Sequence, residues 1–136
     1  MTIRQQIVDA LTLKFKNVPG IVTATPWRKS PFIAAECPAL YLADAEDRIE
    51  SVVIGLHDHH LTVACWLFLR RDLAGGTVRE LMAGIMAAVG ADDTLGGLAI
   101  IVRPLSATTN LLQQGDIISA AEITMEVHYR TPRWGI

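Results

Sequence analysis

The residues best suited to chemistry in this 136-residue chain lie together in the segment His57-Asp58-His59-His60. Imidazole nitrogens bind divalent transition metals, and in an extended segment His57 and His59 point to the same side. His128, far along the chain, is a conceivable third ligand if the two segments pair as strands. No spaced Cys, His or Glu pattern supports these residues, so a solvated strand end is the favoured interpretation. A metal-binding module or small enzyme using His57, His59 and His60 is kept as an alternative.

The acidic and glycine pairs predict turns and caps. Asp92-Asp93 has the residue type for acid/base work, but beside Thr94 and Gly96-Gly97 it is typical of side chains that cap local amides. Gly75-Gly76 and Gly96-Gly97 both lack the spacing of a phosphate-binding loop. We therefore expect no nucleotide site and no cofactor.

The nucleophile candidates are equally sparse. Cys37 precedes a proline and Cys65 lies in an apolar segment, so neither forms a CxxC pair, and two free, reduced thiols are expected. None of the serines has a nucleophile-elbow context. With no catalytic set present, the chain is expected not to be an enzyme.

Composition limits the possible partners. Hydrophobic residues make up 51% and charged residues 19%, with a net charge of −2 and a pI near 6.0. This excess of apolar over charged residues rules out disorder as the main state. The net charge does not indicate binding to nucleic acid or anionic lipid.

The length fits one domain over residues 1–136. With no signal-peptide pattern and no apolar run long enough for a membrane helix, we expect the protein to stay in the cytoplasm where it is made.

The first half of the chain predicts one helix followed by strands. Thr2 and Gln5 have capping-box spacing, and an apolar stripe continues to a stop at Asn17-Val18-Pro19-Gly20. Residues 21–27 form a short edge strand or an ordered loop whose pairing is open. A short strand is expected at residues 39–42, followed by an acidic stretch at residues 44–50. Residues 49–54 are expected to extend that strand or to form another.

The segment from about His59 to Arg70 is the longest expected strand. One face carries alternate apolar residues from Leu61 to Leu69. The other face begins with His60 and ends with Arg70, yet carries Trp66 and Phe68. A helix of this chain or a neighbouring subunit is therefore expected to cover part of this face.

A second helix is expected to begin at Thr77, with Gly90 as its left-handed cap. A strand at residues 98–102 should stop at Pro104, and residues 106–112 form either a further strand or a loop. A final strand at residues 121–131 alternates strictly between apolar and polar residues, as in an antiparallel sheet with one solvated face. The predicted fold is α+β, with two helices on one face of a mixed, mostly antiparallel sheet of four to five strands.

Two surfaces are candidate interfaces. The apolar tail after the last strand should dock on its own domain or on a neighbour. The basic pairs 28–29 and 70–71, with Arg103, Arg130 and Arg133, could face the acidic stretch of a neighbouring copy, although an ordinary mixed surface explains them equally well. The candidate contact residues are Trp66, Phe68, Arg70 and Arg71 on the long strand and Arg133, Trp134 and Ile136 in the tail.

In the order of its elements and short motifs, the chain resembles the tail-terminator (tail-completion) proteins of long-tailed bacteriophages and prophages, of the lambda minor tail protein U type. The residues that carry the resemblance are Thr2-Ile3-Arg4-Gln5-Gln6-Ile7, Pro38-Ala39-Leu40-Tyr41-Leu42, Leu61-Thr62-Val63, Asp93-Thr94-Leu95-Gly96-Gly97-Leu98-Ala99, Ala121-Glu122-Ile123-Thr124 and Tyr129-Arg130-Thr131. Many of these relatives carry proline where this chain has Asp93.

The resemblance implies a structural protein without catalytic residues. In that family the chains form a hexameric ring on the tail tube, end its polymerisation and present a surface for head joining. The implied partners are further copies of the chain, the tail tube protein and a head-completion or neck protein. The implied location is the bacterial cytoplasm during assembly and then the virion tail. A head-tail connector or neck protein of the same fold is the nearest alternative.

Overall fold

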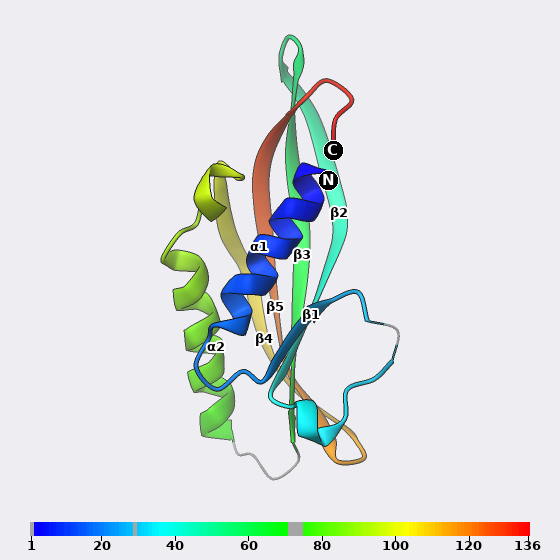
Figure 1. Cartoon of the computed structure of the whole chain (residues 1–136), viewed down its shortest axis with the longest axis vertical. Coiled ribbons are helices and arrows are strands. Elements are labelled where there is room, and N and C mark those ends of the chain that lie inside the picture. The colour runs from blue at the N-terminus through cyan, green and yellow to red at the C-terminus, as the bar shows by residue number, and fades with distance from the viewer. Residues whose placement is uncertain (1, 29, 71–74) are drawn as a thin grey trace.

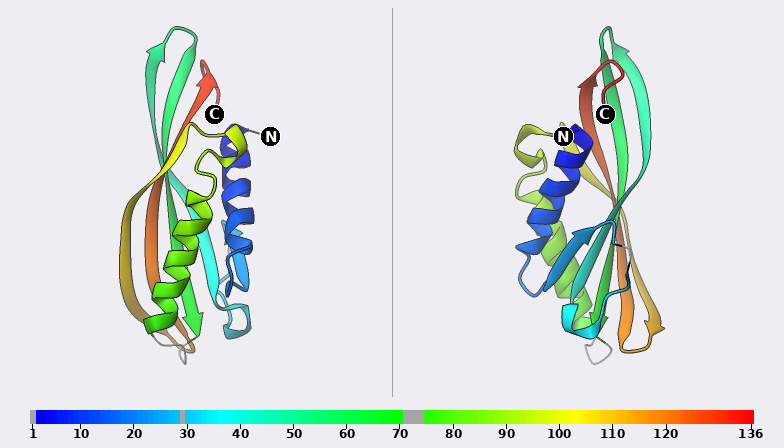
Figure 2. Two further views of the ribbon diagram at one scale, coloured as in Figure 1. Left: turned by 90° about the vertical axis from the view of Figure 1, so that its left-hand side faces the viewer. Right: turned by 45° about the vertical axis from the view of Figure 1, so that its right-hand side comes forward.

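The computed structural model describes residues 2–28, 30–70 and 75–136 and shows two layers (Figures 1 and 2). Helices α1 (Ile3–Lys16) and α2 (Gly75–Gly90) lie on one face of a strongly twisted sheet. The sheet contains β1 (Thr23–Pro26), β2 (Ala39–Val53), β3 (Leu56–Arg70), β4 (Ile101–Gln114) and β5 (Ile117–Pro132). Two single-turn 3₁₀ helices, η1 (Ala34–Glu36) and η2 (Leu95–Gly97), interrupt the connections.

The strand order is β1-β2-β3-β5-β4, with only β1 and β2 parallel. β3 is central and pairs with β2 on one side and β5 on the other along nearly its whole length. β1 pairs with residues 39–42 of β2 alone, so the remainder of β2 and the whole of β4 form edges of the sheet. The predicted α+β class, with both helices on one face of a mostly antiparallel sheet, is confirmed.

The core lies between the helices and the sheet. The apolar stripe of α1 supplies Ile7, Leu11 and Phe15, which are all fully buried. Alternate residues of the strands meet this stripe, because every second side chain of a strand points to the same face. As predicted, the helix-facing set comprises Leu61, Val63, Cys65, Leu67 and Leu69 from β3 and Ile123, Met125, Val127 and Tyr129 from β5.

The strand boundaries correct several expectations. β2 does not end at Leu42 but runs through the acidic stretch to Val53, since its polar residues lie on a long hairpin with β3. β4 does not stop at Pro104 but includes it, and residues 106–112 are strand. Proline is tolerated there because, among the strands that the structure describes, none pairs with the outer side of β4.

The helix ends agree with the sequence in part. Thr2 caps α1, with its Oγ1 accepting the Gln5 amide at 3.0 Å, although the Gln5 side chain turns to Asp9 and leaves the capping box half formed. Thr77 does not begin α2, which already includes Gly75. Gly90 is the last residue of α2 and has no positive φ, so it is not a left-handed cap.

Gly84 allows α2 to approach the connection that follows α1. A Cβ added at Gly84 would lie 2.9 Å from Cγ1 of Val18, a stiff β-branched side chain. We predict that Gly84→Ala lowers the free energy of unfolding by about 1 kcal/mol or more, because the clash exceeds the gain in helix propensity. In a Val18→Ala background the same change should be neutral or stabilising. Urea denaturation of the four proteins of this cycle tests the contact, and an equal effect in both backgrounds would disprove it.

Candidate assembly surface

The face of the sheet away from the helices carries ring pairs across its strands, one stacked and one tilted. His60 of β3 and His128 of β5 are register partners and stack with ring centroids 4.5 Å apart. Further along, Trp66 lies 5.5 Å from Tyr41 of β2. Ring pairs across strands stabilise a sheet that has no helix layer on that side. This open face is therefore partly apolar without being covered by secondary structure.

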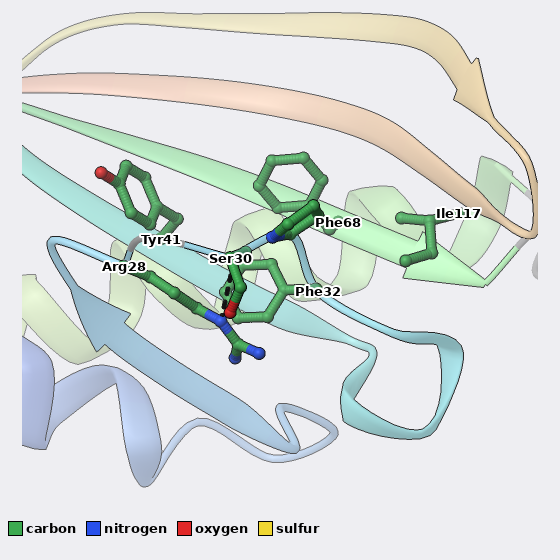
Figure 3. Close-up of a pocket in the computed structure, with 7 residues that line it drawn as sticks. Arg28, Ser30, Phe32, Tyr41, Phe68 and Ile117 are labelled. Carbon is green, nitrogen blue, oxygen red and sulfur yellow. Dashed lines mark hydrogen bonds between the residues drawn. The ribbon is translucent and has the colours of Figure 1, made fainter.

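At one end of the open face, the loop between β1 and β2 folds over the sheet and forms a pocket of about 550 Å³ (Figure 3). Phe32 of this loop packs against Phe68 of β3 at 5.4 Å and is 8% exposed. The expectation that a helix of this chain covers this face is wrong, because both helices lie on the other face and a loop of the same chain covers Phe68 in part. The pocket lining is Arg28, Ser30, Pro31, Phe32, Tyr41, Phe68 and Ile117.

Polar contacts hold the pocket loop in place. The Arg28 guanidinium forms a bidentate pair with the Glu36 carboxylate at 2.5 and 2.8 Å and lies 4.5 Å from the centre of the Phe32 ring. Arg28 also donates to the Ser30 carbonyl at 2.9 Å. The hydrogen bond from Arg28 lowers the pKa of Glu36, so the pair is charged near neutral pH. The pocket is thus formed in a single copy of the chain.

The C-terminal tail turns back at the other end of β3 and ends beside the start of α1 (Figure 1). The Gly135 amide donates to the Pro132 carbonyl at 2.9 Å, and the Arg4 amide donates to the Ile136 carbonyl at 3.2 Å. Trp134 has a φ of 65°, is 85% exposed, and meets His57 edge-on at 5.8 Å. The predicted docking on the chain's own domain holds for the backbone of the tail but not for its indole.

A buried polar network fixes the strand from which the tail leaves. His59 is fully buried, and its Nδ1 and Nε2 lie 2.9 Å from Asp47 Oδ2 and 2.8 Å from Thr131 Oγ1. The Tyr129 phenol donates to the same Asp47 oxygen at 3.0 Å and stacks on His59. Burial, with the Asp47 carboxylate adding to it, raises the pKa of Tyr129, which therefore stays a donor.

The tail continues this network. Thr131 Oγ1 lies 3.3 Å from the Gly135 carbonyl, and its single proton can go either there or to His59. We call the set Asp47, His59, Tyr129 and Thr131 the polar latch. It resembles a hydroxyl–imidazole–carboxylate triad in distances, but Thr131 is 1% exposed and no substrate reaches it.

The histidine segment does not form one site. His57 and His59 share a face as predicted, yet His57 contacts Trp134 while both nitrogens of His59 are used by the latch. His60 and His128 lie on the opposite face of the sheet, so His128 is not a third ligand for His57 and His59. Within residues 2–28, 30–70 and 75–136, no group of three or more His, Cys, Asp or Glu side chains could hold a metal ion.

The thiols and one of the two turn carboxylates, Asp92, are placed as the sequence predicts, whereas Asp93 accepts the Val102 amide with its backbone carbonyl. Cys37 and Cys65 are free and buried, and burial raises the pKa of Cys65 to about 12, so its thiol packs and does not react. Asp92 accepts the amides of Thr94 at 3.3 Å and Gly96 at 2.8 Å, as a turn-capping side chain does.

Most of the described charges in the expected complementary patches are paired within the chain, while Lys29 lies outside the described residues. Asp44 accepts from Arg4 at 2.5 Å and from the Trp27 indole at 2.6 Å, and Asp47 belongs to the latch. Arg103 pairs with Glu126, and Arg130 pairs with Asp58. The acidic stretch is therefore largely neutralised from inside, which argues against it as a surface for the basic groups of another copy.

The structure divides the predicted interface residues between two places. Trp66, Phe68 and Arg70 share the open face of β3, whereas Arg133, Trp134 and Ile136 lie in the tail with His57. Arg71 lies outside the described residues. Sequence reasoning missed the pocket and the latch. Phe32 between Pro31 and Ile33 in an otherwise loop-like segment was the one signal for the pocket.

Loss of the Thr131 hydroxyl should loosen the tail. Thr131→Val keeps the shape but leaves His59 Nε2 without its partner, so we expect the free energy of unfolding to fall by about 1–3 kcal/mol. Hydrogen exchange at the Arg4 and Gly135 amides, which bond to the tail, should accelerate. Thr124→Val, half-buried on the open face of β5, is the control and should change neither quantity. Unchanged exchange in Thr131→Val would contradict the latch.

The lowered pKa of Asp58 predicts how the free energy of unfolding changes at low pH. The Arg130 guanidinium, with a smaller contribution from His128, lowers the pKa of Asp58 from 3.8 to about 2. A lowered carboxyl pKa stabilises the fold above the unfolded pKa of about 3.9, and this contribution is lost as the pH falls through the folded value. Asp58→Asn should therefore be less stable than the parent above pH 4, and the difference should narrow between about pH 4 and 2. Urea denaturation from pH 6 to 2 measures this.

The Arg130→Gln background is the matched control for that experiment. If the ion pair is the cause, Asp58→Asn should have little further effect in a chain that lacks the guanidinium. A full effect of Asp58→Asn in both backgrounds would assign the acid sensitivity to other carboxylates.

No protein-family model and no curated protein matches this chain. A solved chain in the virion of a native gene transfer agent particle shows 14% sequence identity, covering 96% of this chain and 92% of that one, with a TM-score of 0.40. A similarity of this size, although it extends along both chains, establishes neither a shared fold nor a shared function. No helix in the described part of the chain is both long and apolar enough to cross a membrane.

Proposed function

We propose that this chain is a non-enzymatic structural protein of a phage or prophage tail. Its copies form a ring, with six copies as in the family that the sequence resembles. The ring caps the tail tube, ends its polymerisation and provides the surface to which the head joins. On this proposal, its partners are the tail tube protein and a head-completion or neck protein, and assembly takes place in the bacterial cytoplasm before the protein becomes part of the virion tail.

The observation that carries the proposal is the outer margin of the sheet. β4 is a long edge strand that pairs only with β5. Residues 103–109 are exposed although the strand alternates between the two faces of the sheet. α2 lies beside the start of this margin, where Met86 and Val89 line a pocket with Pro104. Isolated proteins protect such an edge with charges, prolines or a covering segment. Within this stretch β4 has Arg103 and Pro104 alone, followed by an exposed Leu105. An edge of this kind suits a protein that functions in an assembly.

The described side chains also favour assembly over catalysis. The hydroxyl, imidazole and carboxylate that lie at catalytic distances are buried in the latch, and the large pocket is lined by aromatic rings and a paired arginine. Aromatic residues and arginine are enriched at protein interfaces.

Solution mass tests the ring. We expect native mass spectrometry of the purified chain to show six copies of the 14.8 kDa protomer, or an equilibrium that reaches six copies and shifts with salt. A strictly monomeric protein over a wide range of concentration and salt, with no binding to purified tail tubes, would disprove the proposal.

Electron microscopy of particles tests the role. Particles assembled without this protein should have tails of uncontrolled length, because nothing ends tube growth. Complementation with the parent chain should restore one length and head joining. Tails of normal length that lack heads would instead assign the chain to the neck.

A further inference from the structure

The exposed indole of Trp134 is presented by a rigid turn. Few bulky residues adopt a positive φ, and those that do are held by their surroundings, so such a residue points to function. Around Trp134, Gly135 leaves no room for a side chain, since an added Cβ would lie 3.0 Å from the Pro132 carbonyl. The Thr131 side chain before the turn belongs to the polar latch. The chain thus fixes an indole in water, where it gains little burial.

The pocket formed by the β1–β2 loop matches this indole in chemistry. Phe32, Tyr41, Phe68 and Ile117 offer apolar contact, and Ser30 and Tyr41 contribute oxygen atoms to the lining (Figure 3). A volume of about 550 Å³ is within the range of pockets that bury a bound group. Buried tryptophans contribute large contact area and usually find a partner for the indole N–H.

The tryptophan and the pocket lie at opposite ends of β3, so they cannot meet within one chain. His57 beneath Trp134 and Phe68 in the pocket are eleven residues apart on this strand, which corresponds to roughly 35 Å. Contact therefore requires two copies, with the tail of one meeting the pocket of the next. Such a head-to-tail contact uses two different surfaces and leaves one of each unused, so it adds further copies and gives a ring where the rotation between copies closes, and a filament where it does not.

The pocket end carries charges of both signs: Arg28, which is paired with Glu36, Arg70 opposite Ile117, and Asp116. Of these, Asp116 is opposite in sign to Arg133 of the tail. Arg133 is exposed next to Trp134, and Asp116 is exposed in the β4–β5 turn next to Ile117. Placing the indole in the pocket brings the turn that carries Arg133 to the end of the sheet that carries Asp116. A rim pair of this kind orients an encounter more than it stabilises the complex.

We propose that Trp134 of one copy inserts into the Phe32–Phe68 pocket of the next copy, and that this contact links the protomers of the ring. The inference rests on the proposed ring, but it goes further, because a ring could also form through other contacts between the protomers. Trp134 is the central residue of this interface, and Arg133 and Asp116 are its charged rim.

Two variants separate the two sides of the contact. Trp134→Ala removes the indole from an exposed position and leaves the pocket intact. Ser30→Trp fills the pocket from its own loop, and the Ser30 backbone carbonyl that accepts from Arg28 is retained. Each variant alone should be monomeric at concentrations where the parent forms rings, with protomer affinity weakened roughly 30-fold or more, as expected for a central tryptophan. Leu13→Ala, which truncates an exposed apolar residue of α1 outside both surfaces and outside the β4 margin, is the control and should keep the ring.

Mixing the two variants is the decisive measurement. The Trp134→Ala chain retains an open pocket and the Ser30→Trp chain retains the indole, so an equimolar mixture should form a one-to-one dimer and grow no further. Native mass spectrometry with one isotope-labelled chain shows the composition. Matched circular dichroism and melting temperatures of the separate variants establish that both fold.

The outcomes separate the two proposals. Rings formed by Trp134→Ala as readily as by the parent would overturn the contact and leave the ring. A parent chain that is monomeric throughout would overturn the ring and the contact together. Monomers of both variants that fail to form a mixed dimer would overturn the contact, because each variant would then have lost assembly for a reason other than the pairing of indole and pocket.

Discussion

The pairing of β3 with β5 is the constraint on which the rest of the structure depends. Two long strands stay in antiparallel register from Leu56 opposite Pro132 to Arg70 opposite Ile117, with a single shift near Phe68. A shift of one residue would exchange the two faces of β5. The register therefore decides which side chains enter the helix-covered core. It also places His59 beside Tyr129 and Thr131, and His60 opposite His128.

The helices cover only one face of this sheet, so the other face is stabilised by its own side chains. Near the tail, ion pairs and stacked histidines stabilise this face. Asp58 and Glu126 each accept hydrogen bonds from an arginine and a histidine. Near the pocket, aromatic side chains take the place of the ion pairs and histidines, and the β1–β2 loop adds Phe32 to them. The face thus changes from polar to aromatic along β3, and the two ends of one chain present different chemistry.

Periodicity predicted the parts of the fold that alternate strictly. β3 and β5 were predicted because their apolar residues recur at every second position, and α1 because its apolar stripe follows a helical period. The acidic residues of β2 break such a pattern: Asp44 and Asp47 find partners on α1, β3 and β5 that local sequence does not reveal. Pro104 suggested a strand end because proline interrupts the hydrogen bonds of a central strand. Local sequence does not show that β4 lies at the edge of the sheet, where proline is tolerated.

The candidate site was less predictable for the same reason. Trp66, Phe68 and Trp134 could be identified as apolar residues where water was expected, since each departs from its local pattern. Their neighbours could not, because Phe32, Tyr41 and Ile117 come from three separate segments that only the strand order brings beside Phe68. The latch likewise joins residues far apart in sequence, and its Asp47 Oδ1 is buried without a hydrogen-bond partner.

The unpaired Asp47 oxygen shows that the latch lowers stability at one atom. Burying a carboxylate and an imidazole costs desolvation energy that their attraction only partly offsets, and well-packed apolar residues of similar volume are often as stable. A polar latch adds direction, since hydrogen bonds fix the angle at which β5 ends and the tail turn begins. A rigid turn loses little conformational entropy when its exposed indole becomes buried, so more of the contact energy remains for association. The stability given up at Asp47 and His59 is thereby linked to the position of Trp134, at the end of the molecule where a second copy would bind.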